Sequence, residues 1–480
     1  MQSNTTRRSF IKRTVLAAGA TQFLTFPHVV RASTRKAINK LRCVQVGCGG
    51  RADTHLEQAI VRYGQTLVAA VDPDDKRHGH VNTFLKAKGA DASKVQFFAD
   101  YRVMFDKMHK EIDAVFVAAP NHHHSTAAMM AMERGINVYC EKPLCHDVSQ
   151  ARQLRQAAKH YGKVATQMGN QGHCEEGYRR LCEYVWGGVI GKVTETHSWT
   201  NRANGGVGLR PPSLPVPANL HWDEWIGPAP YRDYHSDLHP HEWHCWYDFG
   251  NGSIGNMACH VMDGLYWALK VEHPDSIEAE YIRGGSDERY PTGSRLRWDV
   301  PARADMPPLK VYWYEGLNPG TKSEPGRNDA VSGDARNLPP LLVELKKKYP
   351  DEADILDNGD SGTLYVGEKG IIATQTYGKY MHVVGVPPED VDESKMPPKT
   401  LPRPKDIFGD FINACKAGSS QTSVPFEYGA RLTEFAILGN LAQHAGAGNK
   451  IVWDGPNMKV TNIPELNQWV TRPPRKGWKA

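Results

Sequence analysis

Leu41-Arg42-Cys43-Val44-Gln45-Val46-Gly47-Cys48-Gly49-Gly50-Arg51-Ala52 is the stretch of sequence that decides the fold. An apolar run that leads directly into a glycine-rich turn predicts a buried strand and then a helix, the first unit of a dinucleotide-binding domain. Gly47 allows the tight turn, Gly49 lets a pyrophosphate approach the backbone, and Ala52 is small where the helix meets the strand. The helix N-terminus then faces the phosphates, which adds Gly50 and Arg51 to the predicted cofactor-binding residues.

Strand-like and helical segments alternate from residue 40 to residue 165. The predicted strands are 67–71, 114–119, 136–140 and 163–166, and the predicted helices include 125–134 and 148–160. Short buried strands separated by helices pair in parallel through right-handed crossovers, so this part is predicted to be an α/β Rossmann domain with a doubly wound parallel sheet. Ligands bind beyond the carboxyl ends of such strands. The residues there are Asp72, Pro120, Asn121, Glu141 and Lys142.

Asp72 indicates which dinucleotide is bound. It ends the second predicted strand, 25 positions after Gly47, where a carboxylate accepts hydrogen bonds from both ribose hydroxyls and repels a 2′-phosphate. NAD is therefore favoured over NADP, although Lys76 and Arg77 nearby soften the preference.

The second part of the chain, residues 166–455, has a different pattern of predicted strands and helices. Its predicted strands are 276–283, 309–314, 362–366 and 370–374, and its predicted helices are 407–416 and 428–444. Strands bracketed by helices predict an α+β domain with a mostly antiparallel open sheet. Residues 316–360 are expected to form a long loop or insertion, 386–405 a Pro-rich linker and 456–480 a C-terminal tail.

Residues 1–32 are predicted to be a twin-arginine signal peptide. Arg7-Arg8-Ser9-Phe10-Ile11-Lys12 precedes a weakly apolar stretch that is too short and too polar for stable membrane insertion. The chain has 58 Lys and Arg against 53 Asp and Glu, and the leader holds five of the basic residues and no acid, so the mature chain is neutral. Nucleic acid is therefore not an expected partner. We expect recognition by the twin-arginine export machinery and a periplasmic or otherwise exported protein, and the nine scattered cysteines do not suggest a disulfide framework.

The chain resembles the glucose–fructose oxidoreductase, inositol dehydrogenase and rhizopine-catabolism (Gfo/Idh/MocA) family over most of residues 40–455. The motifs that carry the resemblance are the glycine-rich turn, Ala119-Pro120-Asn121-His122-His123-His124, Glu141-Lys142-Pro143, Trp222-Asp223-Glu224-Trp225-Ile226-Gly227-Pro228-Ala229-Pro230 and Asp248-Phe249-Gly250-Asn251-Gly252. The last two resemble a branch common among exported bacterial members.

The resemblance implies a catalytic group. Lys142 matches a lysine that helps to bind cofactor and substrate and tunes proton transfer, and His260 matches the histidine of an Asp-x-x-x-His pair. The family's aspartate is replaced here by Asn256, which is a departure. Hydride transfer from a carbinol needs a base for the hydroxyl proton, and imidazole has a suitable pKa. A nearby ammonium would keep this imidazole neutral. We expect Asn256 to reach the same substrate by hydrogen bonding, and we hypothesise that Asp263 orients the imidazole.

Further residues receive weaker predictions. The resemblance places Asn121 and His124 on the nicotinamide side, and Gln171 and His173 are expected to reach the substrate. His239, His241 and His244 lack a framed zinc motif, so no metal site is predicted. The indoles of Trp222, Trp243 and Trp246 suit either sugar binding or a packed aromatic core.

Three functions remain open from the sequence. The first is an NAD(P)-dependent oxidoreductase that acts on a sugar, polyol or glycoside with a tightly bound cofactor. The second is an NAD-dependent glycoside hydrolase that works by transient oxidation and elimination, and the third is a non-catalytic sugar-binding relative, which Asn256 alone favours. A homo-oligomer is expected from the resemblance. Export of a protein that uses a cytoplasmic cofactor implies that the nucleotide is bound before transport, as the resemblance to exported glucose–fructose oxidoreductase suggests.

Overall fold

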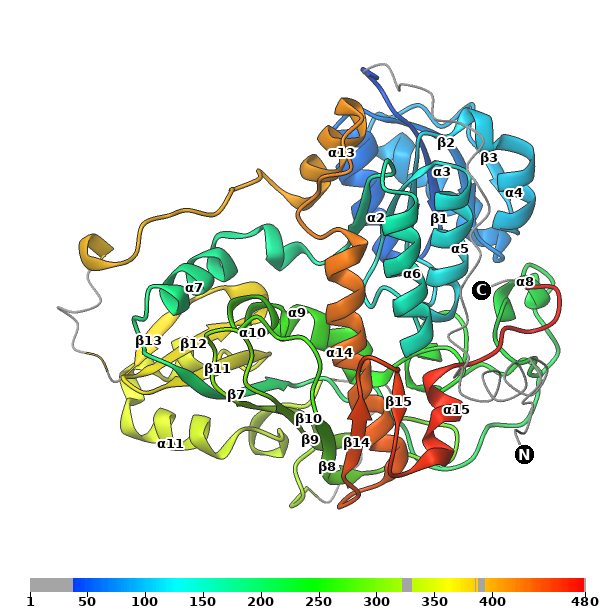
Figure 1. The fold of residues 1–480 in the computed structure, drawn as a ribbon. Coiled ribbons are helices and arrows are strands. Elements are labelled where there is room, and N and C mark those ends of the chain that lie inside the picture. The colour runs from blue at the N-terminus through cyan, green and yellow to red at the C-terminus, as the bar shows by residue number, and fades with distance from the viewer. Residues whose placement is uncertain (1–37, 322–329, 385, 387–392, 479–480) are drawn as a thin grey trace, which may run out of the picture.

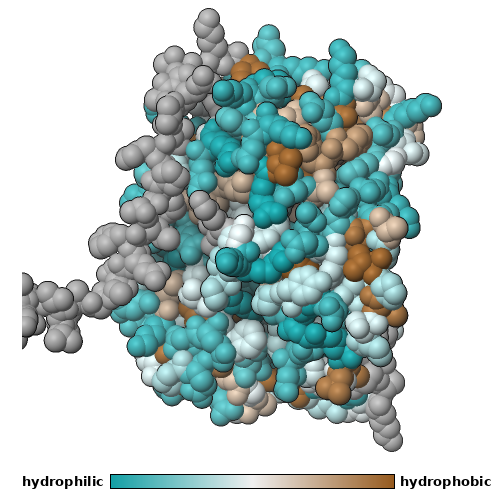
Figure 2. All heavy atoms as spheres, turned by 90° about the vertical axis from the view of Figure 1, so that its right-hand side faces the viewer, coloured by the Kyte–Doolittle hydropathy of each residue, from teal (hydrophilic) through white to brown (hydrophobic). Residues whose placement is uncertain are grey.

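The computed structural model describes residues 38–321, 330–384, 386 and 393–478, so the predicted leader lies outside the described residues. Two sheets with helices packed against them make up the described chain (Figure 1). No described helix is long and apolar enough to cross a membrane. The face on the α8 side is mostly hydrophilic, with separate hydrophobic groups (Figure 2).

The first sheet confirms the predicted Rossmann domain. Its six strands are parallel and lie in the order β3-β2-β1-β4-β5-β6. They are β1 Arg42–Val46, β2 Thr66–Val71, β3 Gln96–Phe98, β4 Ala114–Val117, β5 Asn137–Cys140 and β6 Thr166–Met168. Every residue of β4 and β5 is buried, as expected for a sheet covered on both faces. The sheet includes β6 and so extends beyond residue 165, where the domain was predicted to end.

Three of the described helices of this domain begin at a capping aspartate. They are α2 Gly50–His55, which continues as the π-helix Leu56–Arg62, α3 Asp75–Ala87, α4 Tyr101–Met108, α5 Asn121–Glu133 and α6 Val148–His160. Asp74, Asp100 and Asp147 cap α3, α4 and α6 by accepting backbone N–H bonds. α5 starts four residues before its predicted position, directly after Pro120, so the three consecutive histidines lie in its first turn.

The second sheet is mostly antiparallel, as predicted, and its order is β13-β12-β11-β7-β10-β9-β8-β14-β15. Among the described strands, β7 and β10 form its one parallel pair. The strands are β7 Val193–Thr200, β8 Ser276–Arg283, β9 Gly293–Val300, β10 Leu309–Gly316, β11 Gly362–Gly367, β12 Ile371–Gln375, β13 His382–Val384, β14 Ile451–Asp454 and β15 Lys459–Val460. The sequence pattern did not predict β7 or β9, in which polar residues such as Thr196 and Ser294 are buried.

The helices of the second part are not confined to this sheet. They are α7 Glu176–Trp186, α8 Trp222–Ile226, the π-helix Ile254–Ala258, α9 Cys259–Val261, α10 Asp263–Ala268, α11 Pro340–Lys348, α12 Ala353–Leu356, α13 Ile407–Ala417, α14 Phe426–Ala445 and α15 Asn467–Val470. α13 lies beside the first domain in Figure 1, where Phe408 stacks on Tyr139 of β5. Short 3-10 turns are His109–Glu111, Gln171–Cys174, Glu242–Cys245, Gly333–Ala335, Pro350–Glu352, Thr376–Gly378, Glu393–Lys395 and Pro464–Leu466.

α14 joins the two parts of the molecule. It stands between the two sheets in Figure 1 and is buried around most of its circumference, as expected for a helix that is apolar on all sides. Arg152 of α6 pairs with Glu434 of α14 through Nη2 and Oε1 at 2.6 Å, and the indole of Trp298 in β9 donates to the Phe435 carbonyl at 3.1 Å. The two sheets therefore pack against one shared helix.

Two predicted irregular segments contain ordered structure. The segment 316–360, expected to be a loop, holds α11 and α12, whose Leu342, Leu345 and Leu356 pack in one cluster with Trp199 and Tyr314. The surrounding segment is rich in Gly and Pro, so the pattern predicted a loop, and packing on the sheet stabilises the two helices. The predicted tail contains β15 and α15, and Trp478 contacts the Tyr101 ring of the first domain.

Candidate active site

The glycine-rich turn has the backbone that a dinucleotide requires. Gly47 has a φ of +79°, and a Cβ there would lie 2.5 Å from the Ala119 nitrogen, so no other residue fits. A Cβ at Gly49 or Gly50 would meet nothing within 4 Å, which leaves open space in front of the turn. α2 begins at Gly50 without a side-chain cap. The open space and the uncapped N–H groups fit a pyrophosphate.

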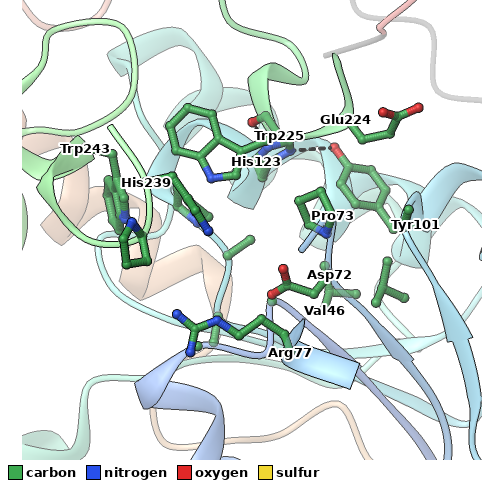
Figure 3. A pocket seen from close by; sticks show the side chains of 18 of the residues that line it. Val46, Asp72, Pro73, Arg77, Tyr101, His123, Glu224, Trp225, His239 and Trp243 are labelled. Carbon is green, nitrogen blue, oxygen red and sulfur yellow. Dashed lines mark hydrogen bonds between the residues drawn. The ribbon is translucent and has the colours of Figure 1, made fainter. Parts of the chain in front are cut away.

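Asp72 lies at the end of β2 and lines the same cavity. Its Oδ2 accepts the Cys48 N–H at 2.7 Å and its Oδ1 accepts the Asp74 N–H at 2.9 Å. Burial raises the pKa of the Asp72 carboxyl, against the effect of these two N–H bonds. A carboxylate oxygen has more than one lone pair, so Asp72 can still accept from ribose hydroxyls. Arg77 lines the cavity beside it (Figure 3).

The cavity measures about 320 Å³ and lies between the two parts of the chain. Figure 3 shows Asp72 and Arg77 on one side of it and Trp225, Trp243 and His239 on the other. Further lining residues are Val46, Gly47, Gly49, Gly50, Arg51, Ala119, Pro120, Tyr101, His123, Glu224, His244 and Trp478. The sequence pointed to His239, Trp243 and His244 without assigning them to the cofactor cavity, and it gave no signal for the C-terminal Trp478.

Residues 217–246, here named the cover, are held over the cavity by contacts to the turn after β2. Asp75 N–H donates to the Asn219 carbonyl at 2.9 Å and His221 N–H to the Pro73 carbonyl at 2.8 Å. Asp74 accepts from Asn219 Nδ2 at 2.6 Å and pairs with His239 Nε2 at 3.1 Å. The cover therefore closes the end of the cavity where Asp72 lies.

The tryptophans and histidines of this region divide between core and cavity. Trp222 stacks on Trp225 at 4.7 Å, and Trp246 lies beneath the Arg289 guanidinium at 4.2 Å, so both indoles belong to a packed core. Trp243 stacks on His244 at 3.7 Å and lines the cavity. In the described part of the chain, no three His, Cys, Asp or Glu side chains are placed to hold a metal ion.

Glu141 and Arg51 form an ion pair beside the glycine-rich turn. Arg51 Nε donates to Glu141 Oε1 at 2.7 Å, and His55 Nε2 lies 3.0 Å from the same oxygen. Burial alone would raise the pKa of Glu141, but Arg51 and His55 outweigh it and hold the pKa well below its ordinary value. Glu141 thus positions Arg51, which lines the cavity.

The two residues predicted to lie on the nicotinamide side, Asn121 and His124, have hydrogen-bond partners within the protein. Asn121 Nδ2 donates to Asn251 Oδ1 at 3.1 Å. The two ring nitrogens of His124 lie 2.8 Å from the Pro143 carbonyl and 2.7 Å from the Ala119 carbonyl. Neither residue lines the cavity, whereas the neighbouring Pro120 does. His124 thus joins the loop after β4 to the loop after β5, which carries Lys142, and Asn121 joins α5 to Asn251 in the second part.

The ammonium of Lys142 donates its hydrogen bonds to uncharged oxygen atoms of Asn256. Its Nζ donates to the Asn256 main-chain carbonyl at 2.7 Å and to Asn256 Oδ1 at 3.3 Å. Asn256 Nδ2 donates to Asn204 Oδ1 at 2.8 Å, which fixes the amide with its oxygen toward the ammonium. Burial lowers the pKa of Lys142 to about 8, although Glu141 acts in the opposite direction. The structure therefore places Asn256 in contact with Lys142, whereas the sequence predicted only that Asn256 would reach the substrate.

His260 is held as a neutral base. Asn170 Nδ2 donates to the Cys259 carbonyl at 2.9 Å, so its Oδ1 faces His260 Nδ1 at 2.7 Å and accepts the imidazole N–H. The lone pair is then on Nε2. Burial, reinforced by the charge of Lys142, holds the pKa of His260 well below its ordinary value. A buried imidazole in a single tautomer is suited to accept a proton.

The hypothesis that Asp263 orients His260 is wrong. Asp263 accepts from Tyr428 at 2.6 Å, and both its oxygens lie 3.0 Å from His173 Nδ1. Asp263 is only three positions after His260, but this spacing does not decide which partner each side chain meets. The partners come from other segments that pack against α9 and α10. Asn170, which does orient His260, lies two residues after the end of β6, and its position near a strand end was the one signal that could have found it.

Gln171, His173 and Tyr377 lie around this group. His173 stacks on Trp267 at 3.9 Å in addition to its bond with Asp263. Gln171 Oε1 is buried and has no hydrogen-bond partner among the described residues. Tyr377, which the sequence did not single out, meets the His260 ring edge-on at 4.8 Å and has a φ of +65°. Strained backbone of this kind gathers at functional sites.

The fold and the site combine a Rossmann cavity with a neutral histidine and a lysine, residue types that a dinucleotide-dependent enzyme would use. Residues 41–169 match the family model described as "Oxidoreductase family, NAD-binding Rossmann fold", and residues 188–286 match "Oxidoreductase family, C-terminal alpha/beta domain". Both matched parts of the chain are thus similar to the Gfo/Idh/MocA family of oxidoreductases, and the first part is an NAD-binding domain.

Known proteins are similar to parts of the chain. An inositol 2-dehydrogenase of Rubrobacter xylanophilus is 27% identical over 178 residues, which cover 37% of this chain and 48% of that protein. A 2,7-anhydro-N-acetylneuraminate hydratase of Mediterraneibacter gnavus is 28% identical over 29% of this chain and 33% of that protein. The matches thus span half or less of these curated relatives. The structure of the WlbA dehydrogenase from Bordetella pertussis with NADH and UDP-GlcNAcA shares the fold, with a TM-score of 0.54, 15% identity, and coverage of 86% of this chain and 99% of that one.

Proposed function

We propose that the protein is an NAD-dependent oxidoreductase that removes a hydride from a carbinol carbon of a sugar, polyol or glycoside. The observation that carries the proposal is the buried, neutral His260, whose Nδ1–H is bound to Asn170 and whose Nε2 lone pair is available. The inositol dehydrogenase among the relatives supports a polyhydroxylated substrate.

Each residue of the group has a role in this reaction. NAD, when bound, supplies the hydride acceptor. His260 Nε2 takes the hydroxyl proton while Nδ1 keeps donating to Asn170, and the ammonium of Lys142 stabilises the developing alkoxide. Asn256 holds Lys142 through both of its oxygens. An amide at position 256 is therefore compatible with turnover, which weakens the case for a non-catalytic relative.

The proposal includes a retained cofactor and export. Residues of the cover and Trp478 line the cavity, and the cover is tied to the turn after β2, which supports slow release of a bound dinucleotide. The twin-arginine pattern of residues 1–32 supports transport of the folded, loaded protein to the periplasm by the twin-arginine machinery. All nine cysteines are buried and free, which is compatible with folding in a reducing compartment.

The proposal also includes a homo-oligomer. Five large apolar side chains of residues 207–231 are exposed, namely Val207, Leu209, Leu214, Val216 and Tyr231. Apolar groups concentrated on one segment are typical of a contact surface. Light scattering on the purified protein would measure its mass, and a monomer at all concentrations would contradict this part of the proposal.

A second candidate function is hydrolysis by transient oxidation and elimination. The hydratase among the relatives favours it, because a hydratase adds water to its substrate without a net oxidation. Such an enzyme returns the hydride to the sugar, so its retained cofactor needs no external oxidant.

One experiment separates these functions. The purified protein is denatured and the released nucleotide is measured by absorbance and mass spectrometry; the absence of NAD(H) would count against both candidates. The intact protein is then incubated with a panel of sugars, polyols and glycosides. Oxidation leaves a keto-sugar and reduced cofactor, whereas hydrolysis leaves neither. Full activity in both Lys142→Ala and His260→Ala would show that the site is wrongly assigned.

A further inference from the structure

Tyr377 places an aromatic ring from the second sheet against the proposed base. It lies in the 3-10 turn Thr376–Gly378, between β12 and β13. Its ring meets the His260 ring at 85°, with 4.8 Å between the ring centroids. His260 is 4% exposed, whereas Tyr377 is half-buried. The tyrosine ring therefore has the imidazole on one side and is partly open to solvent on another.

The turn that carries Tyr377 is fixed from two directions. A Cβ at Gly172 would lie 2.8 Å from Tyr377 Cα, and a Cβ at Gly177 would lie 1.9 Å from the carbonyl oxygen of the residue after Tyr377. Contacts this close are possible only because both positions lack a side chain. On the other side of the turn, Thr376 N–H donates to the Ser361 carbonyl at 3.0 Å. The ring is therefore held at a defined place beside His260.

The backbone of Tyr377 is strained. Its φ of +65° and ψ of 17° lie in the left-handed region, which is unfavourable for a residue with a side chain and persists where the surroundings impose it. Tyr380 on the same loop also has a positive φ, +49°, but its ring is 67% exposed. What distinguishes Tyr377 from Tyr380 is thus the contact with His260 and not the strain.

The other neighbours of His260 hold its edge and its backbone. Asn170 binds Nδ1 at 2.7 Å, and the Tyr178 hydroxyl donates to the His260 carbonyl at 2.5 Å. Among the described aromatic rings, that of Tyr377 is the one in contact with the imidazole. The charged groups that act on the imidazole are Lys142, Glu141 and Arg51.

We propose that Tyr377 is a positioning residue, whose ring shields His260 from water and keeps the imidazole in the orientation that Asn170 sets. A ring that covers the imidazole maintains the desolvation that favours its neutral form. Water that is kept away from His260 also cannot compete with a substrate hydroxyl for Nε2. Neither effect needs the Tyr377 hydroxyl. The inference rests on the role of His260 as the base in the function proposed above.

Histidine NMR tests the shielding without any turnover. The protein is labelled at its histidine rings and titrated, and the His260 signal is identified by its absence in His260→Ala. In Tyr377→Ala water reaches the imidazole, so its pKa should rise toward the ordinary value by about one unit or more. Tyr377→Phe keeps the ring and should titrate like the parent. Tyr377→Gly removes the ring and also relieves the backbone, so a rise shared by the Ala and Gly variants cannot come from strain.

Turnover of the best substrate gives a second readout. In Tyr377→Ala, kcat should fall by up to about a hundredfold, while KM changes little, because the base and not the binding of substrate is disturbed. A raised pKa keeps His260 protonated up to a higher pH, so the acid limb of the pH–rate profile should move to higher pH. Tyr380→Ala is the matched control, since it removes an exposed ring from the same loop at a similar backbone conformation.

The result that would overturn the inference is an unchanged His260 titration in both Tyr377→Ala and Tyr377→Gly. A rise of the same size in Tyr377→Phe or in Tyr380→Ala would also overturn it, because the ring beside His260 would then not be the cause. If the titration shifts as expected but the parent protein oxidises no sugar, the shielding of His260 stands and it is the proposed function that fails.

Discussion

The cofactor end and the catalytic end of the site are built in different ways. At the cofactor end, Gly47, Gly49 and Asp72 lie within one strand-turn-helix-strand unit, and the backbone of that unit makes the cavity floor. At the catalytic end, His260, Lys142 and Asn170 come from three segments that meet only in the folded chain. The first end can be recognised from spacing along the chain, whereas the second depends on how α14 and the second sheet pack against the first domain.

The largest effect that separates the two ends is expected from His260→Ala. Loss of the general base should lower kcat by about 10²–10⁴-fold, while the nucleotide content of the purified protein stays at the level of the parent. The measurements are turnover of the best substrate and NAD released on denaturation. His109→Ala, at a half-buried position after α4, is the control. Loss of the nucleotide together with activity would show that the two ends are not independent.

Two glycine variants divide the cofactor end itself. Gly47→Ala requires a φ of +79° and places a Cβ 2.5 Å from the Ala119 nitrogen, so it should lower the free energy of unfolding by about 1–3 kcal/mol or more. Gly49→Ala meets no protein atom within 4 Å and should keep the parent's stability while losing nucleotide. Thermal unfolding and nucleotide content measure the two effects. Equal loss of stability in both variants would contradict the assigned roles.

Asn170 and Asp263 provide a sharper test of the catalytic end. Asn170→Asp places a carboxylate beside His260 Nδ1, which should raise the pKa of the imidazole and move the acid limb of the pH–rate profile toward higher pH. Asn170→Ala should reduce kcat by about ten- to a hundredfold, the cost of one buried hydrogen bond. Asp263→Asn should leave the position of the acid limb unchanged, since Asp263 faces His173 and Tyr428. A shift in Asp263→Asn alone would restore the hypothesis that the structure contradicts.

The smallest effect is expected at the cover. Asn219 binds Asp74 without lining the cavity, so Asn219→Ala loosens the cover and leaves the cofactor's contacts in place. The rate of NAD release should rise about two- to fivefold, in line with one partly exposed polar contact. Release is followed after dilution into excess labelled NAD, with Asn449→Ala, an exposed site after α14, as the control. An unchanged rate would mean that the cover does not limit cofactor exchange.

Much of the fold followed from local patterns. The strand before Gly47, the bounds of α6 and β8, and the helix at 426–445 agree closely with prediction, because an apolar run of the right period needs only a core to pack on. β7 and β9 were missed because their buried faces include polar groups, such as Ser198 and Ser294, that find partners only across the sheet and in neighbouring strands. α11 and α12 were missed because the sheet beneath them supplies their apolar contacts.

The sequence by itself determined the dinucleotide turn, the acid at the end of β2, and the presence of Lys142, Asn256 and His260. Each rests on neighbours a few positions away, or on a motif whose parts are close in the chain. Only the tertiary structure decided that Asn170, 90 positions from His260, fixes its tautomer, and that His239, 165 positions from Asp74, holds the cover over the cavity. Contacts at such separations leave no periodic signal, because they are set by which elements pack together and not by the spacing of residues along the chain.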